Sequence, residues 1–342
     1  MPRWYRKIRA ALRLRARRQY LLARAVRRTR RQLKLRRDRT ALIASDAILL
    51  FATLRNERVR LPYFLDYYRG LGVDHFLIVD NGSTDGSGEW LAAQPDVSLW
   101  RTGASYKASR FGMDWMNGLL RRYGTGHWCL TVDPDEFLVY PHCDTRPLRA
   151  LTDWLDSSSI RSFSGMLIDV YPKGPIDAET YEEGTDPFLI ARWFDPAGYV
   201  IHKNPMYGNL WIQGGPRLRA FFPDEPQKGP ALNKIPLVRW MRPYVYVEST
   251  HMLLPRSLNL VYDEDGGEKA SGCLLHAKFL STFAEKAREE LSRRQHYAES
   301  QEYRAYHAGL RRGPTLWTEQ SREVEDWRVL EELGLMSKGN WA

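Results

Sequence analysis

Cysteine is scarce in this chain of 342 residues, which contains only Cys129, Cys143 and Cys273. These three are too scattered for a disulfide framework, and none has the partner spacing of a zinc site. Long apolar runs are also missing. The longest, residues 47–52, has the length of a strand, so we expect neither a membrane-spanning segment nor a secretory signal. These absences favour a protein of a reducing compartment, the cytoplasm.

Positive charge is confined to one end of the chain. The net charge is +10, but residues 1–39 hold 17 Lys and Arg against one acid, which gives +16 and leaves −6 for the remainder. In this basic arm, Trp4, Ile8 and Leu12 recur at helical spacing. Two interpretations stay open: a basic helix on the anionic inner face of a membrane, and a solvated tail. Nucleic-acid binding is disfavoured because no known nucleic-acid motif accompanies the charge.

Beyond residue 40, short apolar runs alternate with amphipathic segments. This alternation is typical of a mostly parallel twisted sheet with helices on both faces, in which ligands bind at the carboxyl ends of the strands. Residues 172–245 are rich in Pro, Gly and aromatic residues and are expected to form long loops. We expect strands at 47–53, 75–79, 97–101, 127–132 and 163–171, and helices at 61–71, 86–94, 109–123, 146–155 and 317–333.

The acidic cluster Asp133-Pro134-Asp135-Glu136 follows the predicted strand 127–132. Three carboxylates this close repel one another unless a cation or hydrogen-bond donors compensate them. Mg²⁺ and Mn²⁺ take carboxylate oxygens and commonly join them to substrate phosphates. An acidic surface turn is the alternative, but Arg55-Asn56-Glu57 and Asp80 fall at other strand ends of the same sheet edge. The position therefore favours a divalent cation.

Residues 54–87, LRNERVRLPYFLDYYRGLGVDHFLIVDNGSTDGS, resemble the start of family 2-type glycosyltransferases with the GT-A fold. In those enzymes an RNE turn and a VDxGSTDGS turn precede a DxD motif, whose spacing Asp133-Pro134-Asp135 matches. The similarity extends over about residues 45–295 and implies transfer of a sugar from a nucleotide-diphosphate sugar. Weaker motifs that are similar to one bacterial branch lie at 213–219, 234–237, 249–251 and 274–279.

The resemblance also implies roles for single residues. Asp133 and Asp135 would bind Mn²⁺ or Mg²⁺ with a late histidine, and His276 is favoured over His251. Lys278 would then meet the diphosphate. The resemblance also assigns Asp80 to the base or ribose, and Asn81 stands where many relatives carry a second acid. Arg55, Asn56 and Glu57 are further candidate nucleotide-sugar contacts. Arg55 could instead form a structural pair with a carboxylate rather than bind a phosphate, and Glu57 could only stabilise the start of the next helix.

Inversion at the sugar carbon, which the resemblance favours, requires a base that deprotonates the acceptor hydroxyl. Asp169 is the first candidate, and Asp224 and Glu225 are further ones. Arg217 and Arg219 are expected either to contact an anion or acceptor, or to form only the basic face of a loop.

The sequence therefore predicts a metal-dependent glycosyltransferase that acts on a glycan or lipid-linked acceptor in cell-surface or capsular polysaccharide synthesis. Two alternatives stay open: a nucleotidyltransferase on a similar fold, and a catalytically lapsed protein that docks on membranes or nucleic acid. The predicted parts are a basic arm (1–40), a nucleotide-sugar-binding half (45–140), an acceptor-binding half (141–300) and a C-terminal helical extension (301–342).

Overall fold

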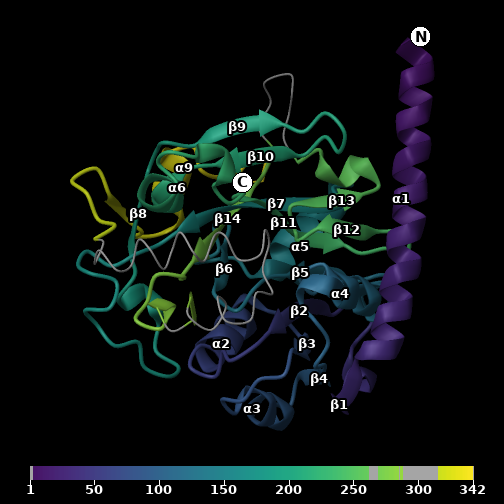
Figure 1. The fold of residues 1–342 in the computed structure, drawn as a ribbon, viewed down its shortest axis with the longest axis horizontal. Helices are drawn as coiled ribbons and strands as arrows, with labels where there is room; N and C mark the ends of the chain where they lie inside the picture. The colour runs from purple at the N-terminus through teal and green to yellow at the C-terminus, as the bar shows by residue number, and fades with distance from the viewer. Residues whose placement is uncertain (1–2, 262–268, 285, 288–314, 342) are drawn as a thin grey trace.

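A nine-stranded sheet forms the centre of the protein (Figure 1). The computed structural model describes residues 3–261, 269–284, 286–287 and 315–341. Six strands run in one direction and β1, β11 and β6 run against them, so the predicted α/β fold with a mostly parallel sheet is confirmed. Across the sheet the order is β1 (Lys34–Arg37), β4 (Val97–Arg101), β3 (His75–Asp80), β2 (Ile48–Leu54), β5 (Trp128–Thr131), β11 (Asn233–Arg239), β7 (Ser162–Asp169), β14 (Gly272–His276) and β6 (Glu136–Val139).

Helices cover both faces of this sheet, as the alternation predicts. Leu50 of β2 packs in one core with α2 (Leu61–Leu71) and α5 (Leu148–Ser157). The next residue, Phe51, points to the opposite face and packs in a second core with α4 (Met113–Leu119). Successive side chains of a strand point to opposite faces, and a strand buried on both faces reads as a continuous apolar run.

The helix predicted over 109–123 begins later, at Met113. Arg110, Phe111 and Gly112 have φ angles of 58°, 55° and 76°. Left-handed residues cannot belong to a right-handed helix, so the predicted start is wrong. Beyond α4 the chain continues as a π-helical turn, Leu120–Gly124.

The prediction of long loops over 172–245 is wrong for β11, which lies in the middle of the sheet between β5 and β7. Proline removes a ladder hydrogen bond and argues against a central strand. Pro236 is accommodated because the register with β7 shifts between Lys234 and Leu237. The same region also contains helix α6 (Gly215–Phe221) and the short strands β8 (Trp193–Phe194), β9 (Val200–Lys203) and β10 (Leu210–Gln213). At its end the chain forms two further short strands, β12 (Val245–Glu248) and β13 (Met252–Leu254).

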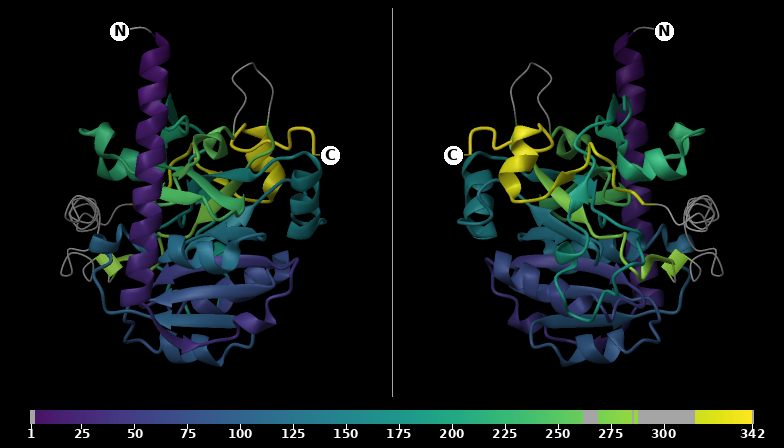
Figure 2. Two further views of the ribbon diagram at one scale, coloured as in Figure 1. Left: turned by 90° about the vertical axis from the view of Figure 1, so that its right-hand side faces the viewer. Right: turned by 90° about the vertical axis from the view of Figure 1, so that its left-hand side faces the viewer.

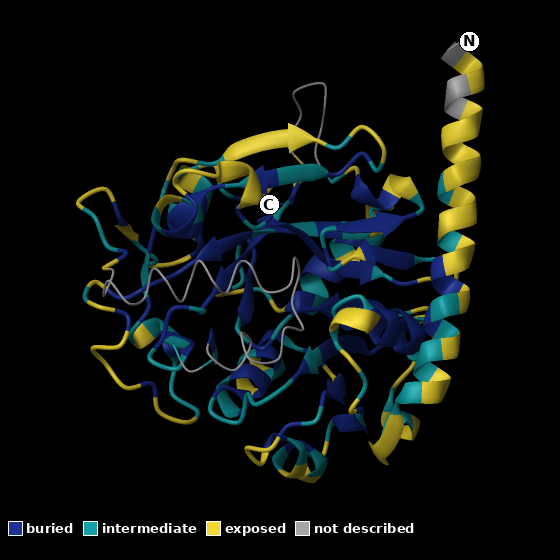
Figure 3. Cartoon of the chain, viewed as in Figure 1, coloured by how far each residue is buried: buried dark blue, intermediate teal, exposed yellow. Residues whose placement is uncertain are grey.

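The basic arm forms helix α1 (Arg3–Gln32), whose N-terminal end projects beyond the rest of the protein (Figures 1 and 2). Toward its C-terminal end, Leu21 and Leu22 are buried in a cluster with residues of β12 and β13. The projecting part is exposed (Figure 3), with Trp4 63% and Leu12 59% accessible. None of the helices in the described part of the chain has the length and apolar character needed to cross a bilayer.

The two predicted halves share the one sheet. Residues 45–140 supply β2 to β5 and the edge strand β6, which pairs with β14 from residues 141–300. The division into two halves stays a prediction. Of the predicted C-terminal extension, the described residues contain α9 (Trp327–Glu332) and the short strand β15 (Arg322–Glu323), so the helix expected over 317–333 is shorter than predicted.

Candidate functional site

A cavity of about 660 Å³ opens where β2, β3 and β5 end. Leu54 ends β2, Asn81 follows β3 and Asp133 follows β5, and all three line the cavity. This is the edge at which parallel sheets bind ligands. Nine of the residues predicted from the sequence line it, namely Arg55, Glu57, Asn81, Asp133, Asp135, Arg217, His251, His276 and Lys278.

The acidic cluster forms the turn between β5 and β6. The Asp133 side chain is 50% exposed, whereas that of Glu136 is buried. The Glu136 amide donates to the Asp133 carbonyl at 3.0 Å, and the Asp133 amide donates to Glu136 Oε2 at 3.3 Å. Ala277, just after β14, donates its amide to the Asp135 carbonyl at 2.8 Å. Hydrogen bonds within the turn and from Ala277 therefore fix its backbone, while the Asp133 carboxylate is half exposed and the Glu136 carboxylate is buried.

A row of polar side chains runs from Asp135 into the protein. His276 Nε2 lies 3.3 Å from Asp135 Oδ2, and His276 Nδ1 lies 2.6 Å from Asp169 Oδ1. The second oxygen of Asp169 accepts from Arg217 Nε at 2.7 Å. Burial alone would lower the pKa of His276, but Asp135 and Asp169 outweigh it and raise that pKa. Likewise, burial alone would raise the pKa of Asp169, but Arg217 and His276 hold it below its usual range.

This row fits part of a divalent-cation site. Two ligands of one cation lie about 3 Å apart when each bond is about 2.1 Å and the angle is near 90°. The 3.3 Å between Asp135 and His276 agrees with that spacing. A metal-binding histidine usually donates its other ring N–H to a carboxylate, a backbone carbonyl or water, and Asp169 is such a partner for His276.

The third predicted ligand, Asp133, does not complete a preformed set. Among the residues that the structure describes, no three His, Cys, Asp or Glu side chains are grouped so that they could hold a metal ion. The rival histidine, His251, also lines the cavity, and its Nδ1 lies 2.5 Å from the Asn233 carbonyl, which is an equally usual partner for a metal-binding histidine. What favours His276 is the contact of its Nε2 with Asp135, another of the predicted ligands.

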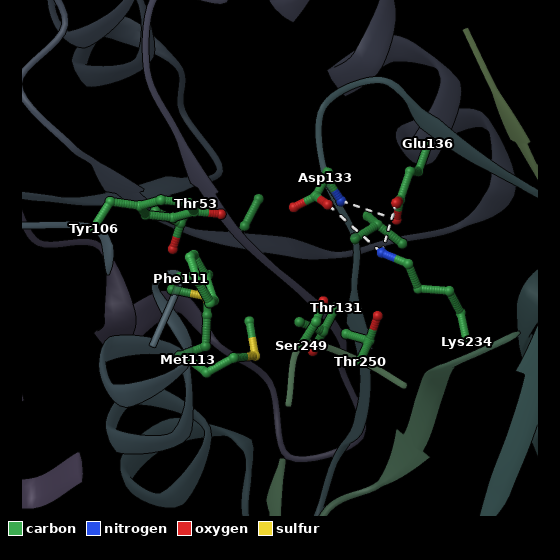
Figure 4. Close-up of a pocket in the computed structure, with 13 residues that line it drawn as sticks. Thr53, Tyr106, Phe111, Met113, Thr131, Asp133, Glu136, Lys234, Ser249 and Thr250 are labelled. Atoms are coloured by element: carbon green, nitrogen blue, oxygen red, sulfur yellow. Dashed lines mark hydrogen bonds and ion pairs between the residues drawn. The ribbon is translucent and has the colours of Figure 1, made fainter. Parts of the chain in front are cut away.

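Lys234 is a cavity residue whose role the sequence did not reveal. This buried lysine of β11 places Nζ 2.7 Å from Glu136 Oε1 and 3.6 Å from Asp133 Oδ2 (Figure 4). Burial raises the pKa of Glu136 to about 7, and Lys234 offsets part of that effect. A lysine inside an apolar strand is the signal that could have identified it, because such residues are rarely buried without a charged partner.

A second group of charges surrounds Glu57, which the sequence predicted, and contains two cations that it did not reveal. Glu57 forms ion pairs with Lys286 and, at 3.7 Å, with Arg60 Nη1. All three line the cavity. Burial raises the pKa of Glu57 and lowers that of Lys286. Carboxylates of the cavity are thus paired with protein cations, Glu136 with Lys234 and Glu57 with Lys286 and Arg60.

The RNE turn and the turn after β3 hold each other in place. Arg55 Nη1 donates to the Asn81 carbonyl at 3.0 Å. Asn56 has a left-handed backbone, with φ 51°, and its side-chain oxygen accepts from the Thr84 amide at 2.9 Å. Arg55 and Asn81 line the cavity, whereas Asn56 faces the neighbouring turn. The geometry supports a positioning role for Asn56, and the side chains of Arg55 and Asn81 also hold neighbouring backbone where they line the cavity.

Three other predicted residues lie off the cavity wall. Asp80 is 1% exposed, and its Oδ1 accepts from the Ser83 amide at 2.7 Å. Asp169 is buried behind His276. Arg219 pairs with Asp195 through two contacts, at 2.9 and 3.1 Å. These groups support neighbouring structure, and none of the three contributes to the cavity surface.

Comparisons with known proteins leave the activity open. No protein-family model matches this chain, and no curated protein does. One similar solved structure is that of 4-diphosphocytidyl-2C-methyl-D-erythritol synthase, at 17% identity and a TM-score of 0.25 over 42% of this chain and 68% of that one. Another, assigned as a glucose-1-phosphate thymidylyltransferase from Bacillus anthracis, has 7% identity and a TM-score of 0.29 over 84% and 94% of the two chains. Similarity this low identifies no activity.

Proposed function

We propose that this protein is a metal-dependent glycosyltransferase of the GT-A type, which moves a sugar from a nucleotide-diphosphate sugar to a hydroxyl of a glycan or lipid-linked acceptor. The observation that carries the proposal is the contact of Asp135 with His276 beside Asp133 on the wall of a 660 Å³ cavity, with Asp169 behind His276. A cavity of this volume accommodates a ligand of drug or cofactor size.

In this proposal different cavity residues bind different parts of the nucleotide-sugar donor. Arg55 and Asn81 bind the nucleoside end, because they lie after β2 and β3. Lys278 contacts the diphosphate. Asp133, Asp135 and His276 would hold a divalent cation, which when bound would neutralise charge that develops on the diphosphate leaving group.

We further propose that Asp169 positions His276 and does not act as the base. Both of its oxygens are engaged, one by His276 and the other by Arg217, and it is buried away from the cavity. An acceptor hydroxyl must come within hydrogen-bond reach of its base. The two other candidates, Asp224 and Glu225, are exposed and do not line the cavity either.

The acceptor then enters from the side formed by residues 141–300, where Trp211 and His251 line the cavity. We propose that the projecting part of α1 binds an anionic membrane surface and so brings the enzyme to lipid-linked or growing surface glycans. Its charge and its exposed Trp4 and Leu12 support this. That placement corresponds to the inner face of a membrane.

The test combines ligand binding with product analysis. Nucleoside diphosphates and nucleotide sugars are screened by thermal shift with and without Mn²⁺, since a ligand at a hundredfold excess over its Kd stabilises the folded state by about 2.7 kcal/mol. Incubation with the stabilising nucleotide sugar and Mn²⁺ should release a nucleoside diphosphate and the free sugar by slow hydrolysis, with water in place of the acceptor hydroxyl. Asp133→Asn and Asp135→Asn should abolish that release, whereas Asp66→Asn, an exposed carboxylate of α2, should not.

Other outcomes point elsewhere. Synthesis of a nucleotide sugar with release of inorganic diphosphate would identify a nucleotidyltransferase. No stabilisation by any nucleotide would contradict the proposal and leave a docking protein without activity as the remaining interpretation.

A further inference from the structure

Two aromatic side chains form one side of the cavity. Tyr106 and Phe111 both line it, and their rings lie 6.0 Å apart at an interplanar angle of 71°. Figure 4 shows a smaller pocket that shares these two residues with the cavity. In that pocket Tyr106 and Phe111 lie on one side, and Lys234 and Glu136 lie on the other. Arg55 and Asn81, the proposed nucleoside contacts, line the same cavity. The two rings are arranged edge to face, so one of them can present its face to a planar ring while the other supports it from the side.

The backbone that presents Phe111 is strained. Arg110 and Phe111 are both left-handed, and Gly112 after them is left-handed too. Two successive bulky residues in this conformation cost free energy and persist only where the surroundings hold them. Gly112 also allows a close approach, because a Cβ there would lie 3.0 Å from Thr53 Oγ1 and 3.1 Å from Tyr106. The segment therefore needs support from outside itself.

That support comes from α1, far away in the sequence. Asp114, at the start of α4, is fully buried. Arg24 of α1 donates Nε to Asp114 Oδ2 at 2.8 Å, and its Nη2 donates to the Ala108 carbonyl at 2.7 Å. Arg110 Nη1 reaches the other oxygen of Asp114 at 3.3 Å. One arginine of α1 thus holds both the start of α4 and the segment between Tyr106 and Phe111.

Arg28, one turn later in α1, also pairs with Asp114, and its Nε lies 3.5 Å from Asp114 Oδ2. Arg110 continues the chain of contacts by donating Nη2 to the Tyr246 carbonyl of β12 at 3.1 Å. Arg24 is therefore the residue of α1 whose bonds join Asp114 to the Ala108 backbone.

We propose that Phe111 presents the ring face on which the planar base of the nucleotide lies, with Tyr106 supporting it edge to face, and that Arg24 is a positioning residue that keeps this aromatic surface in place. The inference rests on the proposed function, because it assigns the base of a nucleotide donor. Its consequence is that helix α1, besides any role at a membrane, completes the nucleotide site.

The experiment compares ligands that share a diphosphate and differ in the base. The full-length protein is titrated with a panel of nucleoside diphosphates and with inorganic diphosphate, both in the presence of Mn²⁺. Phe111→Leu should weaken binding of the preferred nucleoside diphosphate about tenfold, since stacking of a base on an aromatic ring contributes at this level. Binding of inorganic diphosphate should be unchanged.

Arg24→Lys tests the positioning role. Lysine keeps a positive charge beside Asp114 but cannot make the two-sided contact of the guanidinium. We expect nucleoside diphosphate to bind about fivefold more weakly, with a higher KM for the donor at unchanged kcat. Arg28→Lys, the matched control, should alter none of these.

The possible failures are distinguishable. If the wild-type protein binds no nucleotide, the proposed function fails and takes this inference with it. If it binds nucleotide but Phe111→Leu has wild-type affinity, the aromatic surface does not hold the base. If Arg24→Lys weakens inorganic diphosphate as much as the nucleotide, or acts no more strongly than Arg28→Lys, Arg24 does not position that surface.

Discussion

His276 is held from behind by Asp169, which lies 2.6 Å from the Nδ1 of its ring, so that Nε2 is turned toward the cavity and Asp135. β7 and β14 are adjacent and parallel, and their register places Asp169 directly beside His276. The contact fixes both the direction of the ring and the position of its proton, because an ionised carboxylate only accepts hydrogen bonds.

The first prediction separates two roles of Asp169. Asp169→Asn should weaken activation by Mn²⁺ about 10- to 100-fold, the usual cost of losing an outer-shell partner of a metal-binding histidine. Activity at saturating Mn²⁺ should largely return. The measurement is nucleotide-sugar turnover against Mn²⁺ concentration. Asp195→Asn is the control, since this carboxylate is held by Arg219 away from the cavity. A low kcat with unchanged Mn²⁺ affinity would instead restore Asp169 as the base.

The second prediction concerns the buried pair of Lys234 and Glu136. Lys234→Met should reduce the free energy of unfolding by about 3–5 kcal/mol at pH 8, because it leaves a buried carboxylate without its cation. Lys234→Met combined with Glu136→Leu should recover much of that loss, since the double variant buries no charge. Urea unfolding of the wild type, both single variants and the double variant measures the coupling. Additive single effects would show that the pair is not coupled.

A third prediction follows from His75, a buried residue of β3 whose Nε2 lies 2.9 Å from Ser98 Oγ. Burial, together with the positive charge of Arg39, lowers its pKa below the ordinary 6.5. The unfolded chain therefore binds a proton more readily than the folded protein. The contribution of neutral His75 to the free energy of unfolding is fully present above pH 6.5. It decreases as the pH drops from there toward the lowered pKa of His75 in the folded state.

His75→Gln removes this titration. The variant should therefore lose less stability than the wild type between pH 7.5 and 5.5, as measured by urea unfolding at both values. Parallel losses in the two proteins would assign the acid sensitivity to other groups.

A fourth prediction addresses the projecting part of α1. Trp4→Ser combined with Leu12→Ser should reduce sedimentation with vesicles that contain an anionic lipid, while turnover of a soluble acceptor is kept. Leu189→Ser, at a similarly exposed leucine (65%) away from the arm, is the control. Binding should also weaken with salt, because each Lys or Arg near the surface contributes about 1 kcal/mol through charge. Sedimentation that is equal with neutral vesicles, or that needs nucleic acid, would contradict the proposal.

The sequence by itself determined the layered α/β fold and the edge at which the site lies. β3 is buried along all six residues and β2 along six of its seven, so their apolar runs predict central strands covered on both faces. Because parallel strands end at one edge, Asn81 and Asp133 meet there although 52 positions separate them in the sequence. The helical spacing in the basic arm indicates a helix as one of two interpretations, and α1 is that helix.

Tertiary structure alone decided which polar groups face the cavity. Asp80 and Asn81 are neighbours, yet the first bonds its own turn and the second lines the cavity. Asp169 lies behind His276 because two strands that are distant in sequence pair in one register. Arg24 reaches the Ala108 carbonyl because a helix folds back over α4. Such contacts depend on where separate elements come to lie, and local periodicity carries no information about that.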